Sequence, residues 1–141
     1  MSTTKVTTGK GYRSEVRMGE HIIIADEPAT GGGTDQGPSP YDLLAASLGT
    51  CTSMTLRHYA NREGYPLDGV EVSVSHERIH AEDCESCESE KGYVHRFRVG
   101  LKFEGGDLTG AQRAKLLDIA GRCPVAKTLT REIIVEDFIE P

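Results

Sequence analysis

Hydrophobic and polar residues alternate along two stretches in the second half of the chain, residues 70–76 and 94–103. In the first stretch, valines occupy every second position and polar residues stand between them. Such alternation is typical of half-buried strands, so we expect an antiparallel pair joined by the acidic, cysteine-bearing residues 81–92. Two shorter segments, residues 12–16 and 21–26, predict a hairpin near the N-terminus.

A long helix is predicted between these two groups of strands. Ser39 is a suitable N-cap, Pro40 suits the first helical position, and Asp42 stands three residues after the cap. We expect the helix to end before Gly64, which supplies a stop signal. Residues 43–56 keep helical residue types but carry almost no charge, so we expect this part to be buried on all sides.

The remaining elements follow from local signals. Thr109 and Gln112 form a capping-box signature before a second helix that ends near Arg122. Pro124 begins a short third helix, and residues 132–139 predict a final strand. Strands, helix, strands, helix and strand follow one another without internal repeats. This order predicts one α+β domain over all 141 residues, with helices against a mainly antiparallel sheet.

Residues 28–37 contain three successive glycines and predict no regular structure. They form either a mobile connection or a loop that is shaped around something. The loop lacks the G-x-x-x-x-G-K-[ST] arrangement of a phosphate-binding loop, and it does not lead straight from a strand into a helix. The sequence therefore gives no support for nucleotide binding.

Composition narrows the classes of partner. The 22 acidic residues outnumber the 16 basic ones, the formal net charge is −6, and the cations are scattered, so we expect no nucleic-acid partner. No apolar run approaches the roughly 18 residues that span a bilayer. We therefore expect a soluble, cytoplasmic protein without a membrane partner. Cytoplasmic thiols are kept reduced, so the four cysteines are better interpreted as catalytic or metal-binding than as structural disulfides.

Two cysteines far apart in the chain indicate thiol redox chemistry. Cys123 stands immediately before Pro124, where the positive end of the helix dipole favours a thiolate. Cys51 lies in the middle of the long helix and gains nothing from a dipole, so its activation needs a nearby cation, for which an arginine is the natural candidate. A lone buried cysteine is more often a small apolar core residue.

A second group of candidate ligands has the spacing H-x3-H-x3-C-x2-C and consists of His76, His80, Cys84 and Cys87. Sets of this kind are plausible ligands for zinc. The two histidines share a strand face only if the strand continues unbroken to His80. Two alternatives stay open: an acidic hairpin tip with incidental thiols, and an auxiliary redox-active dithiol.

The runs GPSPYDLLAASLGTC at residues 37–51 and RCPV at residues 122–125 resemble the OsmC/Ohr family, and the similarity covers nearly the whole chain. The run HAEDCESC at residues 80–87 resembles a branch that is also found fused behind α/β-hydrolase domains. The resemblance implies mainly antiparallel sheets packed around a long central helix. It also implies an intertwined homodimer with active sites at the subunit interface.

The resemblance implies a thiol-dependent peroxidase of the organic hydroperoxide reductase type. Cys51 would attack the distal peroxide oxygen and become a sulfenic acid, with which Cys123 would condense. A small-molecule or lipoyl-type dithiol would reduce the resulting disulfide, without a metal or organic cofactor. The alternative is a non-enzymatic or zinc-binding OsmC-like stress protein that uses His80, Cys84 and Cys87.

The family's activating arginine lies in the first strand region. Here that region offers Arg13, with Arg17 and Lys10 as alternatives. The family's glutamate, ten residues before the first cysteine, is Tyr41 in this chain. Asp42 is one step further along, roughly 100° around a helix, and either replaces that glutamate or caps the helix.

Overall fold

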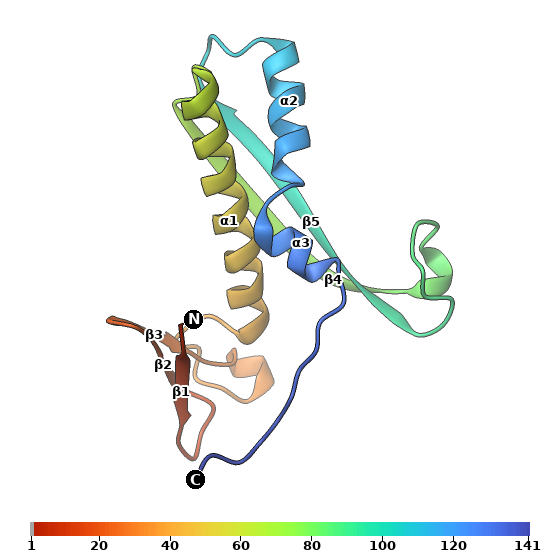
Figure 1. The fold of residues 1–141 in the computed structure, drawn as a ribbon. Coiled ribbons are helices and arrows are strands. Elements are labelled where there is room, and N and C mark those ends of the chain that lie inside the picture. Colours follow the sequence, from red (N-terminus) through yellow and green to blue (C-terminus); the bar gives the residue numbers. More distant parts are fainter. Residues whose placement is uncertain (1) are drawn as a thin grey trace. The chain divides into compact units, whose positions relative to one another are not determined.

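The computed structural model describes residues 2–141 and contains helices and antiparallel sheets (Figure 1). The chain divides into two compact units, one that ends at Leu44 and one from Ala45 to Pro141. The predicted fold class, α+β with antiparallel sheets, is confirmed. Every helix in the described part of the chain is too short or too polar to cross a membrane.

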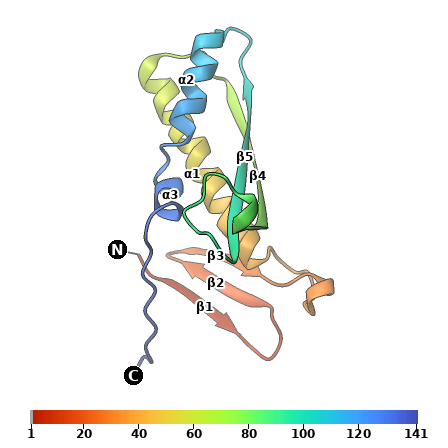
Figure 2. The same ribbon diagram turned by 90° about the vertical axis from the view of Figure 1, so that its right-hand side faces the viewer.

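A three-stranded antiparallel sheet of order β1-β2-β3 lies in the first unit (Figure 2). Val16 pairs with Ile23 and is buried, and Gly19 adopts φ +63° in the turn between these two strands, so the predicted hairpin is confirmed. The first strand was not predicted because all five of its residues are exposed and no apolar alternation marks it. The strands are β1 (Thr4–Thr8), β2 (Ser14–Met18) and β3 (His21–Ala25).

The predicted long helix is α1 (Pro40–Glu63), and it ends before Gly64, which has φ +69°. The prediction of burial on all sides is wrong for this chain, because Met54 is 67% exposed. Residues four apart lie on one side of a helix, so the single chain covers one stripe of α1. The buried residues of that stripe are Leu48, Thr52, Leu56 and Ala60.

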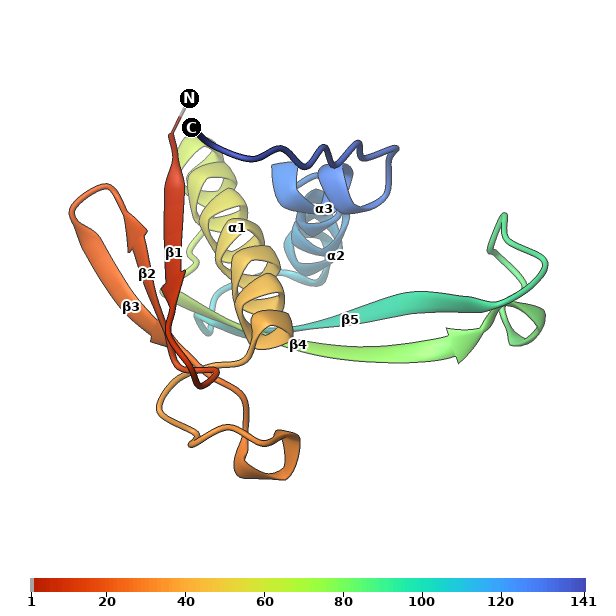
Figure 3. The same cartoon turned by 90° about the horizontal axis from the view of Figure 1, so that it is seen from below.

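Two long strands, β4 (Gly69–His80) and β5 (Tyr93–Glu104), form the predicted antiparallel pair. The pair is longer than predicted, because the ladder continues as far as His80 opposite Tyr93. The helices of the second unit lie on one face of this hairpin (Figures 2 and 3). A Cβ atom at Gly49 would lie 3.2 Å from Val74 Cγ2, so the glycine permits α1 to approach β4 closely.

The second helix, α2 (Gly110–Ala120), begins as predicted. Gln112 N–H donates to Thr109 Oγ1 at 3.1 Å, and Thr109 N–H donates to Gln112 Oε1 at 3.0 Å, which completes a capping box. One apolar cluster joins α1, α2 and the segments that follow α1 and precede α2. Its buried members are Leu56, Ala60, Leu67, Leu108, Leu116, Ile119 and Ala120.

The C-terminal segment differs from the structure predicted for it. Residues 132–139 were expected to form a strand, but they have no regular secondary structure. Ile134 is 80% exposed, Phe138 is 81% exposed and Ile139 is 97% exposed. A strand needs a neighbouring strand for its backbone hydrogen bonds, and a sequence rich in apolar, β-branched residues does not by itself supply one. The tail therefore presents an exposed apolar surface.

Candidate active site

Cys123 is the N-cap of α3 (Pro124–Leu129), as the Cys-Pro pair predicts. Its backbone is extended, with φ −65° and ψ 142°, and Pro124 occupies the first turn. The Sγ atom accepts a hydrogen bond from Ala126 N–H at 3.3 Å. The thiol thus takes the place that a serine or aspartate side chain takes at other helix N-termini. Cys123 is 0% exposed, so its sulfur is held inside the second unit.

Thr52 connects α1 to this sulfur, and the sequence reasoning missed it. Its hydroxyl oxygen lies 3.5 Å from Cys123 Sγ and 2.9 Å from the Leu48 carbonyl oxygen, as donor to each. The hydroxyl has one proton, so it serves one of these acceptors at a time. Because Thr52 directly follows Cys51, this contact brings Cys123 to the turn of α1 that carries the other predicted cysteine.

Cys51 lies outside the buried stripe of α1. It is half-buried and, like Cys123, it is a free thiol. Met54 and His58 follow at three and seven positions, a spacing that places them on the same side of the helix. An open groove of about 460 Å³ runs further along α1, lined by Ser53, Met54, Arg57, His58, Asn61 and Val70.

The candidate activating cations belong to the first unit, whereas Cys51 belongs to the second. Arg17 Nε donates to Glu15 Oε1 at 2.7 Å, which engages its guanidinium within β2. The side chains of Arg13 and Lys10 are exposed and make no hydrogen bond or ion pair with the residues that the structure describes. Of the three cations, Arg13 and Lys10 are therefore the two whose side chains can still bind an anionic group.

Asp42 caps α1. Its Oδ2 atom accepts a hydrogen bond from Ser39 N–H at 3.0 Å, and Asp42 N–H donates to Ser39 Oγ at 3.2 Å. The backbone hydrogen bond from Ser39, with a smaller contribution from the Ser39 hydroxyl, lowers the pKa of Asp42 below its ordinary value. The capping role is confirmed. Tyr41, at the position of the family's glutamate, is 52% exposed.

Asp26 is a buried carboxylate that the sequence reasoning also missed, and it is 3% exposed. Its oxygens accept hydrogen bonds from Thr34 Oγ1 at 2.7 Å, Glu27 N–H at 2.8 Å and Gln36 N–H at 3.1 Å. The Thr34 hydroxyl makes the largest contribution to lowering the pKa of Asp26, and the backbone donors add to it. A lone aspartate after an apolar strand gave no sequence signal for this role.

The glycine-rich loop is shaped around Asp26, which decides between the two alternatives for residues 28–37. Asp26 N–H donates to the Pro38 carbonyl at 3.0 Å, which closes the loop directly before α1. A Cβ atom at Gly33 would lie 2.0 Å from the Glu27 carbonyl oxygen, and one at Gly37 would lie 2.1 Å from the Ile24 carbonyl oxygen. These positions need glycine because the backbone passes too close for any side chain.

The four zinc-ligand candidates are not gathered into a metal site. Cys84 and Cys87 are joined by a disulfide, and within residues 2–141 no three histidine, cysteine or acidic side chains form a group that could hold a metal ion. Because β4 is unbroken as far as His80, His76 and His80 lie on the same face of the strand. His76 stacks on His95, with Nε2 and Nδ1 2.9 Å apart, while His80 packs against a tyrosine of β5.

The family model described as OsmC-like protein matches residues 33–136. Comparison with curated proteins gives no match. Among solved structures, the chain is similar to a protein from Psychrobacter arcticus 273-4 that is named for osmotic stress and a detoxification response. The two share 25% identity over 91% of this chain and 88% of that chain, with a TM-score of 0.70.

Two further solved structures are organic hydroperoxide resistance proteins. The protein OsmC of Legionella pneumophila shares 20% identity over 92% of this chain and 89% of that chain, with a TM-score of 0.68. The protein OhrB of Bacillus subtilis shares 21% identity over 92% of this chain and 90% of that chain, with a TM-score of 0.59. At these identities the likeness concerns the fold.

Proposed function

The chain belongs to the OsmC-like protein family, and from this membership we propose that it is a thiol-dependent peroxidase that reduces organic hydroperoxides. The observation that carries the proposal is the contact of the buried Cys123 sulfur with Thr52, the residue next to Cys51. This contact brings the Cys123 sulfur to the turn of α1 that carries the second free thiol, Cys51, and a peroxidatic and a resolving cysteine need such proximity.

The proposed peroxidase reaction has three steps. The Cys51 thiolate attacks the distal oxygen of the hydroperoxide, the O–O bond breaks, and the alkoxide takes up a proton and leaves as an alcohol. Cys51 is now a sulfenic acid. The Cys123 thiol attacks its sulfur, water leaves, and a Cys51–Cys123 disulfide forms. A dithiol reductant, either a small molecule or a lipoyl-type group, then reduces this disulfide by two exchange steps and becomes a disulfide itself.

The hydrogen bonds to Cys123 fit a resolving thiol. Ala126 N–H donates to its sulfur, and the Thr52 hydroxyl can turn its one proton from the Leu48 carbonyl to the sulfur, so both groups favour the negative charge that develops when Cys123 attacks. The burial of Cys123 keeps it from meeting peroxide directly, whereas Cys51 is only half-buried. This difference supports Cys51 as the attacking residue and Cys123 as the resolving one.

Cys51 itself needs a cation that stabilises its thiolate and the departing alkoxide. We assign this role to Arg13, since Arg17 is engaged by Glu15. Lys10 is the alternative cation. Asp42 stabilises the start of α1, the helix that carries Cys51. It does not replace the family's glutamate, because its carboxylate accepts the hydrogen bond from Ser39 N–H.

The catalytic assembly proposed here is a homodimer. The side of α1 opposite the buried stripe is open, with Met54 67% exposed, and the C-terminal tail exposes apolar residues up to Ile139 at 97%. Apolar patches of this extent are typical of surfaces that bind another protein. A second copy of the chain would cover both, and it would close the site around the organic part of the substrate.

The experiment that tests the proposal measures peroxide-dependent consumption of a dithiol, with an organic hydroperoxide and hydrogen peroxide side by side. We expect turnover that favours the organic substrate and is abolished by Cys51→Ser. The Cys123→Ser variant is expected to consume one equivalent of peroxide and then to stall with dithiol. A variant that lacks Cys84 and Cys87 serves as the matched control for lost thiols. Absence of turnover in the reduced wild-type protein would contradict the proposal.

A further inference from the structure

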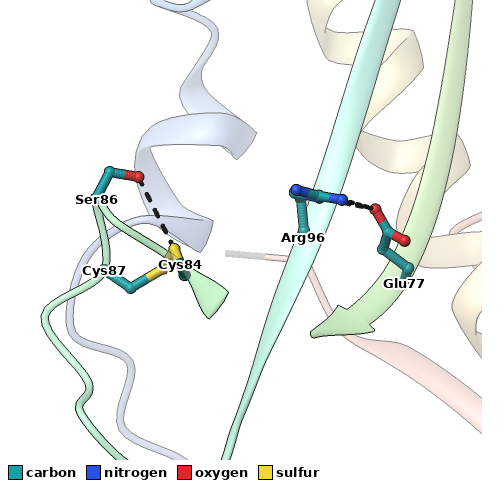
Figure 4. Close-up of a disulfide and its surroundings, with 5 residues drawn as sticks. All are labelled: Glu77, Cys84, Ser86, Cys87 and Arg96. Atoms are coloured by element: carbon teal, nitrogen blue, oxygen red, sulfur yellow. Dashed lines mark hydrogen bonds and ion pairs between the residues drawn. A yellow bond between two sulfur atoms is a disulfide. The ribbon is translucent and has the colours of Figure 1, made fainter. Parts of the chain in front are cut away.

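The connection between β4 and β5, residues 81–92, carries the two cysteines that the proposed peroxidase does not use (Figure 4). Cys84 and Cys87 are joined by a disulfide, with Cα atoms 5.5 Å apart. Ala81 is buried, and its N–H donates to the Gly92 carbonyl at 2.9 Å, so the base of the connection is closed. The Cys84 N–H donates to the Ala81 carbonyl at 3.2 Å, which ties the disulfide to this base.

The disulfide is accessible to a reagent in solution. Both cysteines are half-buried, and residues 85, 86 and 88 beside them are exposed. The polar neighbour of Cys84 Sγ is the exposed Ser86 Oγ at 3.9 Å. The connection projects beyond the helices of the second unit (Figures 1 and 3). A thiol in solution can therefore reach this pair while the helical core stays intact. It cannot reach Cys123 in this way, because Cys123 is buried.

A role as a structural cross-link does not explain this disulfide. The stabilisation from a disulfide grows with the length of the loop that it closes, and a C-x2-C ring is among the shortest. The end of the hairpin is also held independently of it. The ladder pairs His80 with Tyr93, and the Arg96 guanidinium binds the Glu77 carboxylate across the two strands (Figure 4). Neither contact involves the two sulfur atoms, so we expect both to persist when the pair is reduced.

The charge around the Cys84–Cys87 disulfide influences which thiols react with it. Five carboxylates lie in the connection, and Lys91 is its one cation. All five are exposed and stand within three residues of Cys84 or Cys87 in the chain, so they add negative charge around the disulfide. The attacking species is a thiolate, so a thiol that also carries a carboxylate is repelled most strongly, an otherwise uncharged thiol less, and a thiol that carries an ammonium group least. The carboxylates are those of Glu82, Asp83, Glu85, Glu88 and Glu90.

We propose that Cys84 and Cys87 form a second redox-active site, which accepts electrons from a neutral or cationic dithiol and functions independently of Cys51 and Cys123. One sulfur of the reductant attacks the disulfide, a mixed disulfide forms, and the released cysteine takes up a proton. The second sulfur of the reductant then attacks the mixed disulfide. Two electrons and two protons pass to the protein, and the reductant leaves as a cyclic disulfide.

The first test uses the wild-type full-length protein. It is equilibrated in dithiothreitol buffers of different reduced-to-oxidised ratio, quenched by alkylation, and mapped by peptide mass spectrometry so that each cysteine is counted separately. We expect Cys84 and Cys87 to change state together, as one reversible two-electron couple, in the folded protein. A pair that stays oxidised until the protein is unfolded would overturn the proposal. Thiols that oxidise only after a chelator removes bound metal would also overturn it, in favour of a metal site.

The second test measures the charge selectivity. The rates at which cysteamine, mercaptoethanol and mercaptopropionate reduce the pair are each divided by their rates on a small uncharged disulfide. From Coulomb repulsion screened by salt, we expect the cationic thiol to exceed the anionic one on the order of tenfold at low ionic strength, and less in high salt. Equal normalised rates would overturn the assignment of the partner.

A set of charge variants locates the source of this selectivity. In the single variant Glu85→Gln, which removes one exposed carboxylate between the two cysteines, the difference between cationic and anionic thiols should shrink. Glu71→Gln is the matched control, since this exposed carboxylate lies near the other end of β4. We expect the control to keep the full selectivity of the wild-type protein. Equal effects in both variants would show that the overall charge of the protein acts, rather than the connection, and would overturn the proposed local selection.

Discussion

Replacement of Thr52 by valine tests the link between α1 and the resolving thiol. Thr52 is 1% exposed, and its hydroxyl lies within hydrogen-bond distance of Cys123 Sγ and the Leu48 carbonyl. Valine keeps a branched side chain of similar size and removes the donor. A net hydrogen bond is worth about 0.5–1.5 kcal/mol, and sulfur is a weak acceptor, so we expect a loss near the lower end of this range.

This loss should affect the second step of the reaction and spare the first. An interaction of about 0.5–1 kcal/mol that favours the attacking thiolate corresponds to a roughly two- to fivefold slower condensation of Cys123 with the Cys51 sulfenic acid. The rate is measured by rapid acid quench and alkylation after one equivalent of an organic hydroperoxide. Consumption of the peroxide by Cys51 should change little, because Thr52 donates to the other sulfur.

The matched control is Thr55→Val, one turn further along α1, where the half-buried hydroxyl makes no hydrogen bond to either cysteine among the described residues. Urea unfolding of both variants should show a change in the free energy of unfolding below about 1.5 kcal/mol. An unchanged condensation rate in Thr52→Val, or the same slowing in the Thr55→Val control, would refute the reasoning about this contact.

Three predictions concern the fold. Hydrogen bonds lower the pKa of Asp26 below 3.8, so its stabilisation is present above that pH and is lost as the pH falls further. We therefore expect Asp26→Asn to lower the melting temperature at neutral pH, with a difference from wild type that shrinks in thermal scans below pH 3.8. Thr109→Ala removes the capping box of α2 and should cost about 1 kcal/mol in urea unfolding, whereas Thr109→Ser should cost much less. Leu116 is 0% exposed, so Leu116→Ala should cost about 2–5 kcal/mol in the same assay. Losses below about 0.5 kcal/mol at Thr109 or 1 kcal/mol at Leu116 would contradict the packing described here.

Features that depend on neighbours within a few residues could be predicted from the sequence. The caps formed by Ser39 with Asp42 and by Thr109 with Gln112 are contacts over three residues, and both are present. The position of Cys123 at the start of α3 follows in the same way from the proline after it. Alternation in β4 and β5 was sufficient for their pairing, because apolar residues on one face are partners from Val70–Phe103 to Val74–Val99.

Features that depend on distant residues could not be predicted in this way. β1 is a strand only because it pairs with β2, and residues 132–139 lack such a neighbouring strand despite their apolar, β-branched residues. The roles of Asp26 and Thr52 depend on donors or acceptors that the fold brings to them. The spacing of Cys84 and Cys87 suits a metal, a dithiol or a disulfide equally, so the bond between them needed the structure.

The central claim, that Cys51 and Cys123 form one catalytic pair, is tested most directly by a single turnover. The fully reduced protein is mixed with one equivalent of an organic hydroperoxide, alkylated, and digested for mass spectrometry. We expect the Cys51–Cys123 linked peptide as the main product in the wild-type protein, and a stable Cys51 sulfenic acid in Cys123→Ser. Wild-type protein that keeps both thiols free, or that forms only the Cys84–Cys87 disulfide, would contradict the claim.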